Sequence, residues 1–371
     1  METNKVKQLH DFGQSIWLDF LDRKLIRSGQ LKKLIEDDGL RGMTSNPAIF
    51  EKAISSSADY DEQIRELAAT YQNNEAIFYQ LAITDIQNAA DLFKPVFVKG
   101  SDGYVSLEVS PHLAHDANRT IRQAVELWKK VDRENVMIKI PATTDGLPAI
   151  RKSISEGLNI NITLLFGLDR YEEVTEAYLS GLEDRVEAGQ PIDHIASVAS
   201  FFLSRIDVMV DPMLEIKGHP EMKGHPEMKG EIAIACAKQA YQIYKRVFSS
   251  ERFKKLQEQG AMPQHVLWAS TGTKDPSFPD TKYVDALIGP ETVNTVPLET
   301  LEAYRDHGNP ANRLEQDLDK ATQTLAQLKK IGINIDEITA LLENEGIEKF
   351  NKPYDQLLQA IEEKKGHTID A

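Results

Sequence analysis

The strongest constraint on the fold is a regular alternation along the chain. Short runs rich in β-branched and aromatic residues recur, and each is followed by a longer segment whose apolar residues return every three or four positions. The first pattern is typical of buried strands and the second of amphipathic helices. Eight short runs are present: Ser15–Phe20, Gly42–Asn46, Tyr104–Ser110, Val136–Ala142, Asn159–Phe166, His194–Phe202, Val266–Ser270 and Thr292–Pro297.

The segments between these runs predict helices, and the longest should break near Gln72–Asn74. Parallel neighbours need crossover connections and eight strands close well, so the pattern favours an α/β chain folded as a (β/α)8 TIM barrel. An open doubly wound sheet is the alternative. The clearest helical segments are Arg65–Phe93, His115–Val131, Gly146–Glu156, Asp169–Leu182 and Ile232–Arg246.

Additional C-terminal helices should follow the last strand. We expect one domain over residues 1–371, with the barrel core at about 15–300 and a helical extension at about 310–371. These helices could complete the packing, cover the active-site mouth or form a subunit contact. The rule that amphipathic faces seek a core favours the first interpretation.

Charge and composition exclude several classes of function. A formal net charge of −15 and a pI near 5.1 argue against nucleic-acid binding. The first residues lack the apolar stretch of a signal peptide, and no later window resembles a membrane span. The only cysteine, Cys236, cannot form an internal disulfide. We therefore expect a cytoplasmic protein that does not associate with membranes.

The only internal repeat is Gly218–Lys223, which is duplicated without change as Gly224–Lys229. Its Gly-His-Pro content predicts a turn-rich loop. His219 and His225 are conceivable metal ligands, but no carboxylate or thiolate set accompanies them at ligand spacing. We therefore predict no metal site and interpret the repeat as a slipped duplication in a tolerant surface loop.

A lysine lies within the apolar strand Val136–Ala142. Strand periodicity places Lys139 on the same face as Met137, and an unpaired charge there is costly. Two interpretations remain open from this residue alone. Lys139 is either paired with a carboxylate for structure, or is a nucleophilic amine that desolvation keeps partly neutral.

Two carboxylates near strand ends favour the catalytic interpretation. Glu108 lies on the polar face of its strand, and Asp19 projects from the polar face of the first strand. If these faces meet inside the barrel, Glu108, Asp19 and Lys139 surround one cavity at the carboxyl-terminal mouth. An amine with two acids suits attack on a ketone, loss of water to form an imine, and cleavage of the adjacent carbon–carbon bond. A structural ion network is the alternative.

The motifs around these residues also carry a family resemblance. One is Ser-Ile-Trp-Leu-Asp, which ends at Asp19, and another is Met-Thr-Ser-Asn-Pro, whose fourth residue is Asn46. With the strands around Glu108 and Lys139, they resemble the transaldolases, most closely the longer bacterial subfamily. The similarity covers about residues 9–297. The C-terminal helices resemble the family only loosely.

The resemblance implies a role for each polar residue. It implies that Lys139 forms the Schiff base, that Glu108 is an acid/base acting through a water, and that Asp19 is the base at the C4 hydroxyl of the substrate. The substrate-binding residues that it implies are Asn46, Asn161, Thr163, Ser200 and Arg205. The first three would hold the dihydroxyacetone portion and the water, and the last two would line the site and grip the phosphate.

A second phosphate contact is expected after the seventh strand. Ser270 fits the family pattern, but Lys274 stands where an arginine is expected, so Lys274 is either a phosphate ligand or a solvated loop charge. Arg205 offers a planar fork suited to phosphate, and a surface salt bridge is its alternative role.

The resemblance implies a transaldolase of the pentose phosphate pathway. Such an enzyme moves dihydroxyacetone from a ketose phosphate (fructose 6-phosphate or sedoheptulose 7-phosphate) to an aldose phosphate (erythrose 4-phosphate or glyceraldehyde 3-phosphate). Its partners are sugar phosphates, and no metal or organic cofactor is expected. A homodimer is considered as well, without a feature that decides the oligomeric state. The alternatives are a fructose 6-phosphate aldolase and a non-catalytic phosphosugar-binding barrel.

Overall fold

The computed structural model describes residues 4–99, 102–215 and 228–366. Within them, parallel strands follow one another around a closed barrel, and the last strand pairs with the first. The strands are β1 (Gln14–Asp19), β2 (Gly42–Thr44), β3 (Val105–Glu108), β4 (Val136–Pro141), β5 (Ile160–Leu165), β6 (Ser197–Phe202), β7 (His265–Ala269) and β8 (Thr292–Val296). The predicted (β/α)8 barrel is thus confirmed, each predicted run overlaps one strand, and the open sheet is excluded.

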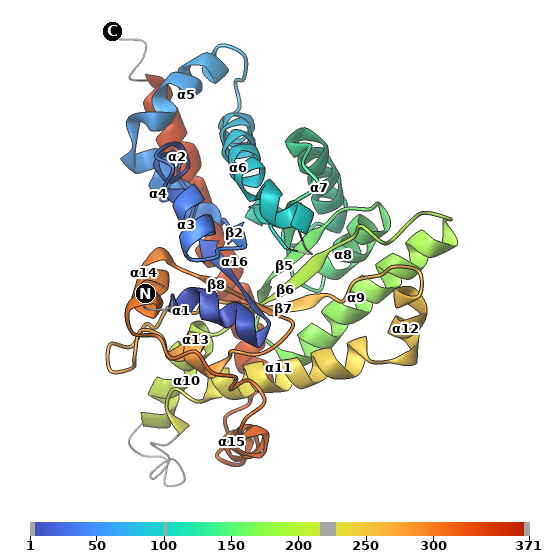
Figure 1. The fold of residues 1–371 in the computed structure, drawn as a ribbon. Coiled ribbons are helices and arrows are strands. Elements are labelled where there is room, and N and C mark those ends of the chain that lie inside the picture. The colour runs from blue at the N-terminus through green and yellow to red at the C-terminus, as the bar shows by residue number, and fades with distance from the viewer. Residues whose placement is uncertain (1–3, 100–101, 216–227, 367–371) are drawn as a thin grey trace.

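Helices surround the barrel (Figure 1). The predicted break near Gln72–Asn74 is confirmed, because one helix ends at Ala68 and the next begins at Asn74. The helical elements before β5 are α1 (Lys5–Gln8), η1 (Leu9–Phe12), α2 (Arg23–Arg27), α3 (Gln30–Asp37), α4 (Pro47–Ser56), η2 (Ala58–Tyr60), α5 (Asp61–Ala68), α6 (Asn74–Lys99), η3 (Pro111–Leu113), α7 (Ala117–Val131) and α8 (Gly146–Ser155). Those after β5 are α9 (Leu168–Glu187), α10 (Ser204–Glu215), α11 (Ile232–Phe248), α12 (Glu251–Gln257), α13 (Lys282–Ala286), α14 (Leu298–His307), α15 (Leu318–Lys330) and α16 (Ile335–Gly366).

Strand register decides which side chains share the barrel interior. Lys139 of β4 pairs in register with Glu108 of β3 on one side and with Asn161 of β5 on the other. Below this level, Trp17 of β1 lies opposite Gly42 of β2. A Cβ atom at Gly42 would lie 2.5 Å from the indole of Trp17, so glycine makes room for this ring.

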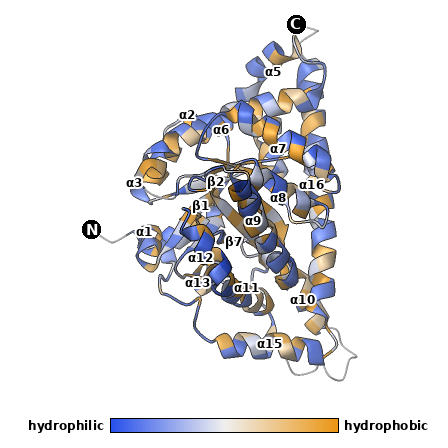
Figure 2. Cartoon of the chain, turned by 90° about the vertical axis from the view of Figure 1, so that its right-hand side faces the viewer, coloured by the Kyte–Doolittle hydropathy of each residue, from blue (hydrophilic) through white to orange (hydrophobic). Residues whose placement is uncertain are grey.

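The C-terminal helix α16 packs across the carboxyl ends of several strands. It contacts β5, η3 after β3, α4 after β2 and α10 after β6. It lies behind the barrel in Figure 1 and along the right-hand edge in Figure 2, opposite the N-terminus. Glu343 fixes it to α9 through Arg170, whose Nε lies 3.1 Å from Oε2 of the glutamate. The hydroxyl of Tyr354 donates to Glu75 of α6 at 2.6 Å. Helix α15 packs instead against α11, so of these two C-terminal helices it is α16 that covers this mouth.

A buried ion pair joins the early helices. Nε of Arg23 donates to Oδ1 of Asp85 at 2.7 Å, and the two side chains are 4% and 1% exposed. The guanidinium carbon of Arg23 lies 4.1 Å from the centre of the Tyr60 ring. Burial raises the pKa of Asp85, whereas Arg23 opposes the shift. The charge of Asp85 therefore depends on Arg23.

Two sequence predictions concern regions away from the barrel. In the described ranges, no helix combines the length and apolar character needed to span a bilayer. His219 and His225 of the duplicated segment lie outside the described residues. Cys236 is a buried free thiol on α11.

Candidate active site

The structure brings Lys139 and Glu108 together inside the barrel. Nζ of Lys139 lies 3.3 Å from Oε2 of Glu108, and their side chains are only 6% and 5% exposed. The same amine donates to the carbonyl oxygen of Ser45 at 2.9 Å. Burial raises the pKa of Glu108 to about 7, although the neighbouring lysine opposes the shift. A carboxyl group that gains and loses a proton near neutral pH thus adjoins a buried amine.

Asp19 approaches the same space from the end of β1. Thr44 donates to Oδ1 of Asp19 at 2.7 Å, and the hydroxyl oxygens of Thr44 and Thr295 are 2.7 Å apart. Because Thr44 has one hydroxyl proton and gives it to Asp19, Thr295 donates to Thr44. Burial raises the pKa of Asp19, and the charge of Lys139 is the largest opposing influence. The two threonines therefore orient the carboxylate of Asp19, and the charge of Lys139 acts to lower its pKa.

A buried network of amide and hydroxyl groups lies beside the amine. Nδ2 of Asn161 donates to Oγ of Ser106 at 3.0 Å, and Ser200 donates to Oδ1 of Asn161 at 2.7 Å. The hydroxyl of Thr163 is buried and has no hydrogen-bond partner among the described residues. Asn161 and Ser200 are therefore joined directly, and among the described residues the hydroxyl of Thr163 on the same strand has no hydrogen-bond partner.

Asn46 has a structural role in addition to the substrate-binding role expected from sequence. Its Oδ1 accepts the backbone N–H of Ile49 at 3.1 Å, and Pro47 occupies the first turn of α4. Asn46 therefore caps this helix. The cap uses the side-chain oxygen and leaves the amide nitrogen available on the half-buried side chain.

Arg205 lies in the first turn of α10, next to a residue that contacts Ser270. Ser204 links them, because its backbone N–H donates to the carbonyl of Ser270 at 3.1 Å and the two hydroxyl oxygens are 2.9 Å apart. Nη1 of Arg205 is buried without a hydrogen-bond partner among the described residues. Burial lowers the pKa of this guanidinium. A buried guanidinium nitrogen with no acceptor is a natural anion ligand.

Lys274 lies in the loop that follows β7. Its side chain is exposed and lines a groove of about 310 Å³ with Asp207 and Asp211. Its charge still acts to lower the pKa of Asp19. Both sequence interpretations of Lys274 therefore stay open.

Phe350 of α16 is a site residue that the sequence did not reveal. The centre of its ring lies 6.0 Å from Nζ of Lys139, and the residue is 7% exposed. Helical spacing alone indicates only that Phe350 is apolar, and nothing in sequence links it to a strand more than two hundred positions earlier. Thr44, by contrast, shared a motif with Asn46 and could have been singled out.

Comparison with known proteins identifies the family of this chain. Residues 16–361 match the family model described as "Transaldolase/Fructose-6-phosphate aldolase". The chain belongs to this family. Its match includes most of β1, all the later strands and most of α16, so the similarity expected to end near residue 297 continues far beyond it.

Curated members of the family are similar over nearly their whole length. The chain is 48% identical over 366 residues to the transaldolase of Saccharopolyspora erythraea, covering 98% of each. It is 47% identical over 373 residues to that of Trichodesmium erythraeum, covering 98% of each. It is 44% identical over 369 residues to that of Frankia alni, covering 99% of each.

Across residues 4–99, 102–215 and 228–366, no group of three or more His, Cys, Asp or Glu side chains could hold a metal ion.

Proposed function

We propose that this chain is a transaldolase that transfers dihydroxyacetone through a Schiff base on Lys139. The observation that carries the proposal is the buried pair of Lys139 and Glu108, in which Nζ lies 3.3 Å from Oε2. Asp19, at the end of β1, is close enough for the charge of Lys139 to oppose the rise of its pKa. Family membership supports it, because curated relatives that are 47–48% identical to the chain bear the name transaldolase.

The first stage joins the amine to the ketone of the substrate. Glu108 takes a proton from the lysine ammonium, and the free amine attacks the carbonyl carbon to form a carbinolamine. Glu108 then returns a proton to the departing hydroxyl, which leaves as water and gives the imine. A pKa of about 7 suits Glu108 to both transfers at neutral pH.

The second stage breaks and remakes a carbon–carbon bond. Asp19 removes the proton of the C4 hydroxyl, the C3–C4 bond breaks, and its electron pair enters the imine to give an enamine. The aldose phosphate leaves, and an acceptor aldose phosphate is attacked by the enamine carbon while Asp19 returns the proton. Hydrolysis then releases the new ketose phosphate, so sedoheptulose 7-phosphate and glyceraldehyde 3-phosphate yield erythrose 4-phosphate and fructose 6-phosphate.

The other residues hold the sugar and exclude water. The free hydroxyl of Thr163 and the amides of Asn46 and Asn161 offer hydrogen bonds to the dihydroxyacetone unit. The unpartnered nitrogen of Arg205 offers a ligand to the phosphate group. Phe350 lies over the amine and limits the access of water to the enamine.

Reductive trapping tests the proposal. Borohydride added with fructose 6-phosphate should attach a three-carbon unit to the peptide that contains Lys139, and Lys139→Ala should lose the adduct. Lys238→Ala is the matched control, because Lys238 is also buried but donates to the carbonyl of Gln316 outside the barrel. An adduct on another lysine, or none, would overturn the proposal.

Release of free dihydroxyacetone distinguishes the alternatives. A transaldolase should release little without erythrose 4-phosphate, whereas a fructose 6-phosphate aldolase should release it at the full rate of cleavage. A non-catalytic barrel should bind fructose 6-phosphate and leave it unchanged.

A further inference from the structure

A second cavity opens at the opposite end of the barrel from the candidate active site. Its volume is about 300 Å³, which is at the lower end of small-molecule sites. It lies between the amino ends of the strands, since Gln14, His265 and Thr292 begin β1, β7 and β8 and all line it. The catalytic side chains come from the other strand ends, so the reaction proposed above does not use this space.

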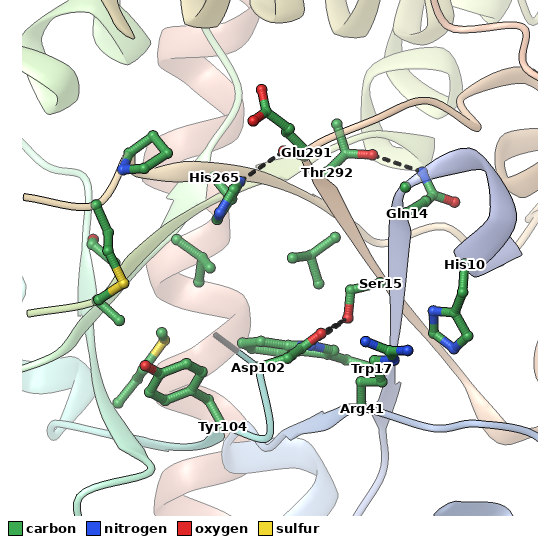
Figure 3. A pocket seen from close by; sticks show the side chains of 18 residues that line it. His10, Gln14, Ser15, Trp17, Arg41, Asp102, Tyr104, His265, Glu291 and Thr292 are labelled. Carbon is green, nitrogen blue, oxygen red and sulfur yellow. Dashed lines mark hydrogen bonds between the residues drawn. The ribbon is translucent and has the colours of Figure 1, made fainter. Parts of the chain in front are cut away.

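The inner part of this cavity is apolar. Trp17, Met137, Val198 and Val293 line it, and all four are at most 6% exposed. In Figure 3 the indole of Trp17 is seen edge-on along one side of the cavity. Gly42 leaves room for this ring, because a larger residue there would collide with it. A flat aromatic wall with aliphatic neighbours favours a planar apolar ligand.

Two polar groups on opposite sides of the opening have hydrogen-bonding capacity left for a ligand. The guanidinium of Arg41 is exposed and makes no side-chain hydrogen bond or ion pair within the described ranges. Nδ1 of His265 lies 2.8 Å from the carbonyl oxygen of Glu291 and donates to it, so in the neutral imidazole Nε2 is an acceptor. Figure 3 shows Arg41 and His265 facing each other across the cavity.

The nearby carboxylate of Asp102 is already occupied. It accepts hydrogen bonds from the hydroxyl of Ser15, from Nε1 of Trp17 at 2.8 Å and from its neighbouring backbone N–H at 3.0 Å. Burial raises the pKa of Asp102. Asp102 thus fixes Ser15 and Trp17. The charge of Arg41 acts on Asp102 without a hydrogen bond between them in the described residues, so the N–H groups of Arg41 are left for a ligand.

We propose that this cavity binds a planar aromatic acid that carries a hydroxyl or ring N–H group at its other end. The ring lies against Trp17, the acid group accepts from Arg41, and the hydroxyl or N–H donates to Nε2 of His265. The two polar contacts fix the orientation, and the apolar wall supplies most of the buried area. The proposal is independent of the transferase reaction.

Calorimetric titration with 6-hydroxy-2-naphthoate tests the proposal. We expect one site per chain and an affinity about tenfold higher than for 2-naphthoate, which lacks the hydroxyl, or for 2-naphthol, which lacks the acid. Arg41→Gln should reduce the affinity for the hydroxy acid to that for the naphthol. Arg65→Gln, on an exposed face of α5, is the matched control and should change nothing.

Filling the cavity gives a second measurement. Val293→Phe should abolish binding, and its circular dichroism and its cleavage of fructose 6-phosphate report whether the barrel still folds. If that variant does not fold, Arg41→Gln still decides, because its side chain is on the surface. Absence of binding, binding unchanged in Arg41→Gln, or displacement of the hydroxy acid by fructose 6-phosphate would each overturn the proposal.

Discussion

The pH dependence of catalysis offers a sharp test of the role of Glu108. Burial raises the pKa of this carboxyl to about 7, and only its ionised form accepts the proton of the neighbouring ammonium. Such a group is roughly 90% ionised at pH 8 and roughly 10% at pH 6. We therefore expect kcat/KM for fructose 6-phosphate to rise about tenfold between pH 6 and pH 8, since this ratio reports groups of the free enzyme.

Substitution should remove this dependence. Glu108→Gln cannot titrate, so its residual activity should fall by about 10²–10⁴ and lose the rise between pH 6 and 8. Asp19→Asn should lower kcat far more than it changes substrate affinity and should keep the rise. Glu187→Gln, at the exposed end of α9, should match the unsubstituted enzyme.

The assay couples formation of glyceraldehyde 3-phosphate to oxidation of a nicotinamide cofactor, with erythrose 4-phosphate as acceptor. Persistence of the rise in Glu108→Gln would show that another group titrates. A flat profile in the unsubstituted enzyme would equally refute the assigned role of Glu108.

Three further perturbations probe other parts of the structure. Phe350→Ala should admit water beside Lys139 and raise the ratio of released to transferred dihydroxyacetone severalfold, measured by product analysis; an unchanged ratio would exclude Phe350 from water exclusion. Arg23→Met should leave the charge of Asp85 uncompensated and cost about 3–5 kcal/mol of unfolding free energy in urea titration; a loss below about 1 kcal/mol would contradict this assignment. Arg205→Gln should raise KM for fructose 6-phosphate strongly and KM for unphosphorylated fructose little; equal effects would argue against a phosphate contact.

The barrel could be predicted from sequence because its signals are local. Buried parallel strands need continuous apolar runs, and crossover helices need amphipathic spacing, so the order of elements fixes the topology. Lys139 was conspicuous for the same reason, since a charge in the middle of an apolar strand requires an explanation.

The parts that sequence missed depend on contacts between distant segments. The amphipathic pattern of α16 showed that one face would be buried but not against which surface, so Phe350 could not be placed near Lys139. The relay from Thr295 through Thr44 to Asp19 joins three strands whose register sequence does not specify. The partnerless nitrogen of Arg205 likewise became visible only when the packing was known.

The position of α16 at the end of the chain affects how this molecule matures. All eight strands precede it, and at a synthesis rate of about 5–20 residues per second the segment from 297 to 366 takes roughly 4–14 s to make. A barrel that folded within that interval would lack the contact between Phe350 and the proposed Schiff-base lysine. A chain that ended in the short connection between Lys330 and Ile335 would contain every proposed catalytic side chain. It would lack α16, the helix that packs across the carboxyl ends of the strands.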